Sequence, residues 1–140
     1  MREILFRGKA INRDKGYHRT EYKNGEWVYG LVTKLYDEQF KILPAEMTNT
    51  NGIRGIEIDY KTIGQYTGMV DKNCTKIFEG DICSFCDTDG GLTNHEVLWF
   101  GGKWVVREAS SNVVDDLDLF FCERSVAIGN IYDNPELLEE

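Results

Sequence analysis

The sequence contains no long hydrophobic run, no secretory signal and no phosphate-binding signature. A membrane-spanning helix needs about 18 or more consecutive apolar residues, and the 140-residue sequence has no such run. The opening Met-Arg-Glu-Ile-Leu-Phe-Arg lacks the apolar core of roughly 7–15 residues that marks a signal peptide. Neither GxxxxGK(S/T) nor GxGxxG occurs, so no nucleotide-phosphate loop is expected. These absences predict a protein that stays in the cytoplasm where it is made, with no membrane contact.

A metal-binding constellation is also missing. The four cysteines are Cys74, Cys83, Cys86 and Cys122, and in a cytosolic chain they are expected to be free thiols. Cys83 and Cys86 have zinc-ligand spacing, and His95 follows nine residues later. However, residues three apart in a strand point to opposite faces, and no second CxxC completes a ligand set. We expect no metal and no other cofactor.

The charge is acidic overall but uneven along the chain. The net charge is −8; residues 1–36 hold eight Lys/Arg and four Asp/Glu (+4), and the remainder hold eight and twenty (−12). The acidic majority disfavours general binding to nucleic acid. The basic segment leaves one alternative open, a nucleic-acid contact through Arg2, Arg7, Lys9, Arg13, Lys15 and Arg19, with Tyr17 or Tyr22.

Short apolar runs separated by Gly, Asn and Asp turns predict an all-β protein with little helix. Hydrophobic and charged fractions of 41% and 29% are ordinary for a globular chain. In Trp27–Tyr36 both faces are partly apolar, which favours a central strand that is buried on both sides, or that has one side buried in a partner. Pro44–Gly55 is rich in Thr, Asn and Gly and favours a loop. Asp71-Lys72-Asn73 predicts a turn, because Asn and Asp side chains bond their own backbone. The remaining expected elements are strands over Glu3–Ala10, Gln39–Leu43, Ile58–Tyr66, Lys76–Phe85 (with a bend at Gly80-Asp81) and Ser125–Tyr132, one short helix over Val114–Phe121 and a frayed or short helical tail over Glu136–Glu140.

The clearest hairpin lies within Glu96–Arg107. Gly101-Gly102 separates two apolar runs and can take the positive φ angles of a tight turn. Trp99 and Trp104 are then expected to face each other across the strand pair. Such aromatic density is compatible with a binding surface, but it favours an ordinary core.

No residues have the pattern of a catalytic site. Glu79 and Asp81 are spaced to share one strand face, and with His95 they form the best enzymatic alternative. An Asp that follows Gly more often bonds turn backbone. His18 has no nucleophile or carboxylate at motif spacing. We therefore expect that the protein is not an enzyme.

Five sequence blocks, in order along nearly the whole chain, resemble the YopX-like proteins of bacteriophages and prophages. The blocks are Phe6-Arg7-Gly8-Lys9, Gly-Glu-Trp-Val-Tyr-Gly (Gly25–Gly30), Ile-Gly-Gln-Tyr-Thr-Gly (Ile63–Gly68), Ile-Phe-Glu-Gly-Asp-Ile (Ile77–Ile82) and Gly-Asn-Ile-Tyr-Asp-Asn-Pro-Glu-Leu (Gly129–Leu137). The resemblance implies a phage-derived, mainly β protein related to SH3-type barrels, with no established activity. Two features depart from such proteins: Cys74 stands where Gly is common after Asp-Lys-Asn, and the segment Ile11–Asn24 is longer than usual.

These observations together predict a fold and a domain organisation. A small SH3-like barrel over residues 69–140, with a short tail, is expected to pack on an N-terminal β subdomain over residues 1–68. One compact unit is the alternative. Within the C-terminal part, Thr75–Asp133 has the right length for a five-stranded barrel.

The predicted function is a phage- or prophage-derived, non-enzymatic module that binds a protein or assembles with itself. Strands that are apolar on both faces need a second layer or another subunit to cover them. The candidate binding residues are Trp27, Tyr29, Tyr66, Trp99 and Trp104. The alternative is nucleic-acid binding through a basic patch of Arg7, Lys9, Arg13, Lys15 and Arg19.

Overall fold

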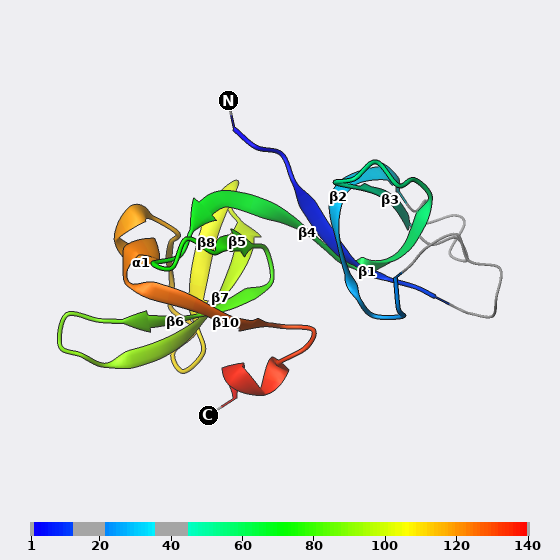
Figure 1. The fold of residues 1–140 in the computed structure, drawn as a ribbon. Coiled ribbons are helices and arrows are strands. Elements are labelled where there is room, and N and C mark those ends of the chain that lie inside the picture. The colour runs from blue at the N-terminus through cyan, green and yellow to red at the C-terminus, as the bar shows by residue number, and fades with distance from the viewer. Residues whose placement is uncertain (1, 13–21, 36–44, 140) are drawn as a thin grey trace. The chain divides into compact units, whose positions relative to one another are not determined.

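The computed structural model describes residues 2–12, 22–35 and 45–139, and the chain divides into two compact units, Met1–Gln65 and Tyr66–Glu140 (Figure 1). Within these residues the protein is mainly β, with two antiparallel five-stranded sheets and one short α-helix. No helix in this part of the chain is long and apolar enough to span a membrane. The elements are β1 (Phe6–Ala10), β2 (Trp27–Lys34), β3 (Ala45–Asn49), β4 (Ile56–Val70), β5 (Lys76–Phe78), β6 (Asp81–Cys86), β7 (Leu92–Phe100), β8 (Lys103–Glu108), β9 (Val114–Asp116), α1 (Leu119–Glu123), β10 (Ser125–Asn130) and the 3₁₀ turn η2 (Pro135–Leu138).

The first sheet has the order β1-β2-β3-β4-β5, and β1 also pairs with β4. Phe6 therefore lies between Gly30 of β2 and Gln65 of β4. The strands enclose apolar side chains that alternate with polar ones, as expected for strands with one buried face. The core of the N-terminal unit consists of Ala10, Val28, Ala45, Met47, Ile56 and Ile58.

Strand β4 takes part in both units. Its first residues pair with β3 and β1, whereas Tyr66 and Val70 pair with Phe78 and Lys76 of β5. The boundary between the units, at Gln65 and Tyr66, thus falls inside one continuous strand.

The second sheet has the order β10-β6-β7-β8-β9. Helix α1 precedes β10 and begins at the N-cap Asp118, whose Oδ1 accepts a hydrogen bond of 2.9 Å from the backbone N–H of Phe121. This cap satisfies a helix-terminal donor that would otherwise have no intrahelical acceptor. The core of the C-terminal unit combines sheet and helix residues: Ile77, Cys83, Val97, Val106, Leu117, Phe121 and Cys122.

Asp71 forms the turn that the Asp-Lys-Asn chemistry predicts. Its Oδ1 accepts hydrogen bonds from the backbone N–H groups of Asn73 and Thr75, and its Oδ2 accepts one from Ala127 of β10. The carboxylate therefore fixes the turn and also attaches it to the last strand. Cys74, in the same turn, has a φ of 64°, so this chain adopts the left-handed conformation there without glycine.

The β7–β8 hairpin is confirmed. Gly101 and Gly102 have φ angles of 64° and 80°, and Trp99 pairs directly with Trp104. The last strand is also confirmed, ending at Asn130 rather than Tyr132, and the tail forms a 3₁₀ turn over Pro135–Leu138.

Two predictions in the N-terminal unit need correction. The strand that begins at Trp27 is not buried on both sides within this chain, because Val28 is buried while Tyr29 and Leu31 are exposed; burial of the second side in a partner stays a prediction. The predicted loop Pro44–Gly55 contains strand β3, in which Ala45, Met47 and Asn49 are buried at alternate positions. The predicted strand Gln39–Leu43 and His18 lie outside the described residues.

The predicted helix over Val114–Phe121 is wrong in its first half. Val114–Asp116 instead forms β9 and pairs with Val105–Arg107 of β8. The strand ends at Asp116, and two residues later the side chain of Asp118 caps α1, so the helix begins only at Leu119.

Candidate functional site

One face of the second sheet carries four of the side chains that the sequence singled out, Cys83, His95, Trp99 and Trp104. In an antiparallel ladder, residues directly opposite each other share a face, and so do residues two apart on one strand. Cys83 pairs with His95, Val97 with Val106, and Trp99 with Trp104. Helix α1 covers part of this face, since Phe121 belongs to the same core.

The end of this face carries an aromatic pair. The ring centroids of Trp99 and Trp104 lie 4.9 Å apart with planes at 74°, an edge-to-face contact. Trp104 packs on the core, whereas Trp99 is 53% exposed and its neighbour Phe100 is 62% exposed. The expectation of an ordinary core therefore holds for Trp104 and fails for Trp99 and Phe100.

The other candidate aromatic residues do not join this pair. Trp27 and Tyr29 belong to β2 of the N-terminal unit, and Trp27 is half-buried beneath Arg7, whose guanidinium carbon lies 4.5 Å from the ring centroid. Tyr66 is half-buried and contacts Phe78, with ring centroids 5.6 Å apart.

The described part of the alternative basic patch does not form an open cationic surface. Arg7 is only 6% exposed, and the ammonium of Lys9 lies 5.4 Å from the centroid of Trp27. Arg13, Lys15, Tyr17 and Arg19 lie outside the described residues. A buried guanidinium against an indole is a packing contact as much as a charge, so Arg7 is poorly placed to meet a phosphate backbone.

The first cysteine of the Cys-x-x-Cys segment belongs to the core, and the second does not. Cys83 is buried, and burial raises the pKa of its thiol far above the ordinary value, so the thiol stays protonated at neutral pH. Cys86 is half-buried, and its Sγ lies 3.7 Å from the carbonyl oxygen of Asp87. Among the residues the structure describes, no group of three Cys, His, Asp or Glu side chains could hold a metal ion.

The two acids of the enzymatic alternative, Glu79 and Asp81, lie at the connection between β5 and β6. Asp81 is buried, and its Oδ2 accepts a hydrogen bond of 2.8 Å from the backbone N–H of Phe78. Glu79 lies in the turn between β5 and β6. Asp81 therefore binds turn backbone, the role that an Asp after Gly commonly takes.

His95 lines a cavity of about 370 Å³ in the C-terminal unit. It is 6% exposed, and its Nε2 lies 2.8 Å from the Thr93 hydroxyl. Its Nδ1 is buried without a hydrogen-bond partner within the described part of the chain. Burial lowers the pKa of His95 below its ordinary value, against the opposing effect of Glu108 and Asp115, so the imidazole is neutral near pH 7. The lining residues are Phe85, His95, Val106, Asp115, Asp116, Asp118, Phe120 and Phe121.

Of the residues that line this cavity, the sequence identified only His95 as a candidate site residue. Phe85 and Phe121 stack at 5.0 Å, and both meet His95 edge to face. The three aspartates come from β9 and the helix cap. The crowding of Asp115, Asp116 and Asp118 was visible in the sequence, but their approach to His95 depends on the strand register.

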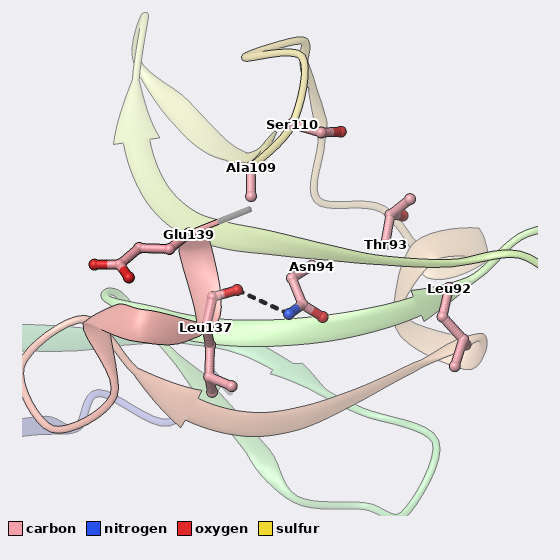
Figure 2. A pocket seen from close by; sticks show the side chains of 7 residues that line it. All are labelled: Leu92, Thr93, Asn94, Ala109, Ser110, Leu137 and Glu139. Carbon is pink, nitrogen blue, oxygen red and sulfur yellow. Dashed lines mark hydrogen bonds between the residues drawn. The ribbon is translucent and has the colours of Figure 1, made fainter.

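A second cavity, of about 260 Å³, lies between β7 and η2 (Figure 2). Figure 2 shows the amide of Asn94 directed at the carbonyl oxygen of Leu137, to which it donates a hydrogen bond of 2.8 Å. This bond attaches the C-terminal turn to the sheet. The lining residues are Leu92, Thr93, Asn94, Ala109, Ser110, Leu137 and Glu139.

A family model described as "YopX protein" matches residues 12–139. The chain belongs to the YopX family. A solved structure, protein EF1440 from Enterococcus faecalis, is similar to this YopX-family protein with 26% sequence identity and a TM-score of 0.53. The similarity covers 99% of this chain and 100% of that one. A search of curated proteins gave no significant match. Neither comparison names an activity.

Proposed function

We propose that this YopX-family protein is a non-enzymatic protein-binding module whose contact surface centres on the end of the β7–β8 hairpin. The observation that carries the proposal is the exposure of Trp99 beside the half-buried Trp104, together with the exposure of Phe100, which follows Trp99 on the opposite face of the same strand end. Large apolar groups exposed at one place on a surface mark interaction sites more often than chance. Tryptophan is also one of the residue types enriched among the energetic anchors of protein interfaces.

The hairpin presents these rings on a rigid support. Trp104 packs on the core of the C-terminal unit and holds Trp99 through the edge-to-face contact. The ammonium of Lys103, in β8 of the hairpin, lies 2.7 Å from Oδ1 of Asp116 on the neighbouring strand β9. A preorganised anchor loses little side-chain entropy on binding, so the arrangement favours recognition of a partner surface.

Binding of nucleic acid through the same rings is the less favoured function. Bases can stack on tryptophan, but Asp115 and Asp116 of β9 lie next to β8 in the same sheet. Their negative charge repels a phosphate backbone. A second copy of the chain is a possible protein partner under the proposal, since exposed aromatic surfaces also drive self-assembly.

Three finer expectations belong to the proposal. The relation to SH3-type barrels, the origin in a bacteriophage or prophage, and action in the cytoplasm of a bacterial host are all implied by the family resemblance and the sequence. The mainly β architecture supports the first of them.

The test is capture of partners from bacterial lysate with tagged wild-type protein, the double variant Trp99→Ser/Phe100→Ser and the matched control Leu92→Ser. Leu92 is an exposed apolar residue at the opposite end of β7. We expect one protein, or a second copy of the chain, to bind the wild type and the control and to be lost from the double variant by at least about tenfold. Circular dichroism confirms that each variant is folded, and nuclease treatment should leave binding unchanged. Equal capture by all three proteins, or loss on nuclease treatment, would overturn the proposal.

A further inference from the structure

We propose that the cavity around His95 binds the guanidinium group of an arginine side chain presented by a partner protein. The proposal deepens the proposed function and rests on it in one respect, namely that the partner is a protein. Three independent features of the cavity carry it: its aromatic walls, its carboxylate rim and its one unsatisfied ring nitrogen.

The walls are suited to a flat cation. Phe85, Phe120 and Phe121 line the cavity, and the centroids of Phe85 and Phe120 lie 6.0 Å apart. Phenyl faces attract cations, and arginine stacks on them more readily than lysine because its charge is planar and weakly hydrated. The protein already shows this contact, since the guanidinium of Arg124 lies 5.5 Å from the centroid of Phe120.

The carboxylates at the rim of the cavity carry more negative charge than the one neighbouring ammonium, that of Lys103, neutralises. Asp115, Asp116 and Asp118 line the cavity, and the ion pair with Lys103 engages Asp116. Asp118 Oδ1 accepts the cap hydrogen bond of α1. The carboxylate of Asp115 makes no hydrogen bond or ion pair with the rest of the described chain, although its charge acts on His95. Three carboxylates against one ammonium disfavour an anionic ligand and favour a cation.

His95 supplies the directional element. It is at least nine-tenths buried, and its Nδ1 lacks a partner within the described residues. Buried polar atoms in native proteins are nearly always hydrogen-bonded, so an orphan in a cavity wall needs an explanation. When the Nε2–H donates to the Thr93 hydroxyl, Nδ1 is an acceptor, and a guanidinium N–H can satisfy it. A guanidinium has five N–H donors, enough for Nδ1 and a carboxylate together.

The size of the cavity agrees with a side chain rather than an ion. Its volume of about 370 Å³ lies at the lower end of small-molecule sites. A bare divalent cation would need several convergent oxygen ligands, and no such group exists among the described residues.

The experiment is a titration of isotope-labelled protein with N-acetyl-L-arginine methylamide, followed by two-dimensional amide NMR. We expect saturable shifts confined to the lining residues, such as Phe85, His95, Val106 and Asp115. The corresponding citrulline derivative, which is nearly isosteric but neutral, should shift them at least about tenfold less at equal concentration. No saturable shifts, or equal shifts with citrulline, would overturn the proposal.

Variants assign the roles of the lining residues. Asp115→Asn should weaken binding of the arginine derivative about tenfold, the loss expected for one hydrogen bond to a charged group. Phe120→Leu should weaken it as well, and Asp89→Asn, in the exposed β6–β7 turn, should leave it unchanged. The amide spectrum reports whether each variant is folded. Unaltered binding in both Asp115→Asn and Phe120→Leu would place the cation elsewhere and refute the site.

The two proposals can fail separately. If the arginine derivative does not bind while capture of a partner still depends on Trp99 and Phe100, the cavity proposal is wrong and the proposed function stands. If the derivative binds at the cavity while capture is insensitive to Trp99→Ser/Phe100→Ser, the cation site stands and the hairpin surface is wrong.

Discussion

Cys74 is an exposed residue with a φ of 64°, in the turn that joins β4 and β5. Only glycine occupies this left-handed region without a steric penalty from Cβ. Replacement of Cys74 by Gly should therefore raise the free energy of unfolding of the C-terminal unit by about 0.5–1 kcal/mol. Urea unfolding followed by circular dichroism measures the change.

Cys74→Ala is the control, because alanine also removes the thiol but keeps Cβ and hence the strain. Its stability should be close to that of the wild type. If the glycine variant is no more stable than the alanine variant, the positive φ is not a source of strain.

Residue-level chemistry could be predicted from the sequence wherever a side chain acts on its own backbone. The Asp71 turn and the Gly101-Gly102 hairpin required only local rules. The exposure of Trp99 could not be predicted, because it depends on how far along the sheet α1 extends. The surroundings of His95 were equally inaccessible, since the cavity joins residues of β6, β7, β8, β9 and α1.

At the scale of elements, the carboxylate of Asp71 connects a turn to a strand that follows about fifty residues later. Its three backbone hydrogen bonds include one to Ala127, 56 positions along the chain. Asp71 is buried and its three hydrogen bonds are part-buried, so removal of the carboxylate leaves three partly shielded N–H donors without their acceptor. Asp71→Ala should cost about 3 kcal/mol of stability in the C-terminal unit, measured by the urea midpoint.

Asp87→Ala is the matched control for this variant. Asp87 Oδ1 accepts hydrogen bonds from the backbone N–H groups of Asp89 and Gly91 in the same local pattern, but both are exposed and close in sequence. Its loss should cost about 1 kcal/mol or less. Equal costs for the two substitutions would show that the bond to β10 adds nothing.

Element boundaries were predictable only where the hydrophobic period was unambiguous. Val114, Leu117 and Phe121 fit a helical period by chance, whereas the pairing of β9 with β8 and the cap at Asp118 decide the outcome. The strand β3 was missed because its buried positions include Ala45 and Asn49, which carry little hydrophobic signal.

At the scale of the whole molecule, the two units have separate cores even though β4 contributes to both. The residues of one core all precede position 59, and those of the other all follow position 76. We expect Met47→Ala to destabilise the N-terminal unit and Ile77→Ala the C-terminal unit, each by about 2–5 kcal/mol, because both side chains are fully buried.

Amide hydrogen exchange read residue by residue checks this expectation. Each variant should lose protection within its own unit and retain it in the other, apart from the shared strand β4. Uniform loss of protection across residues 2–139 in either variant would show that the chain unfolds as one cooperative body.

The edge-to-face contact of Trp99 and Trp104 has an optical consequence. Two indole chromophores whose centroids lie 4.9 Å apart at 74° interact strongly enough to couple their excited states, and the non-parallel planes make that coupling chiral. The protein should therefore show a paired positive and negative band in its ultraviolet circular dichroism. The third indole, Trp27, is not part of the pair. The paired band therefore reports on the end of the hairpin. A partner that inserts between the two rings would abolish the paired band, so binding could be followed without a label.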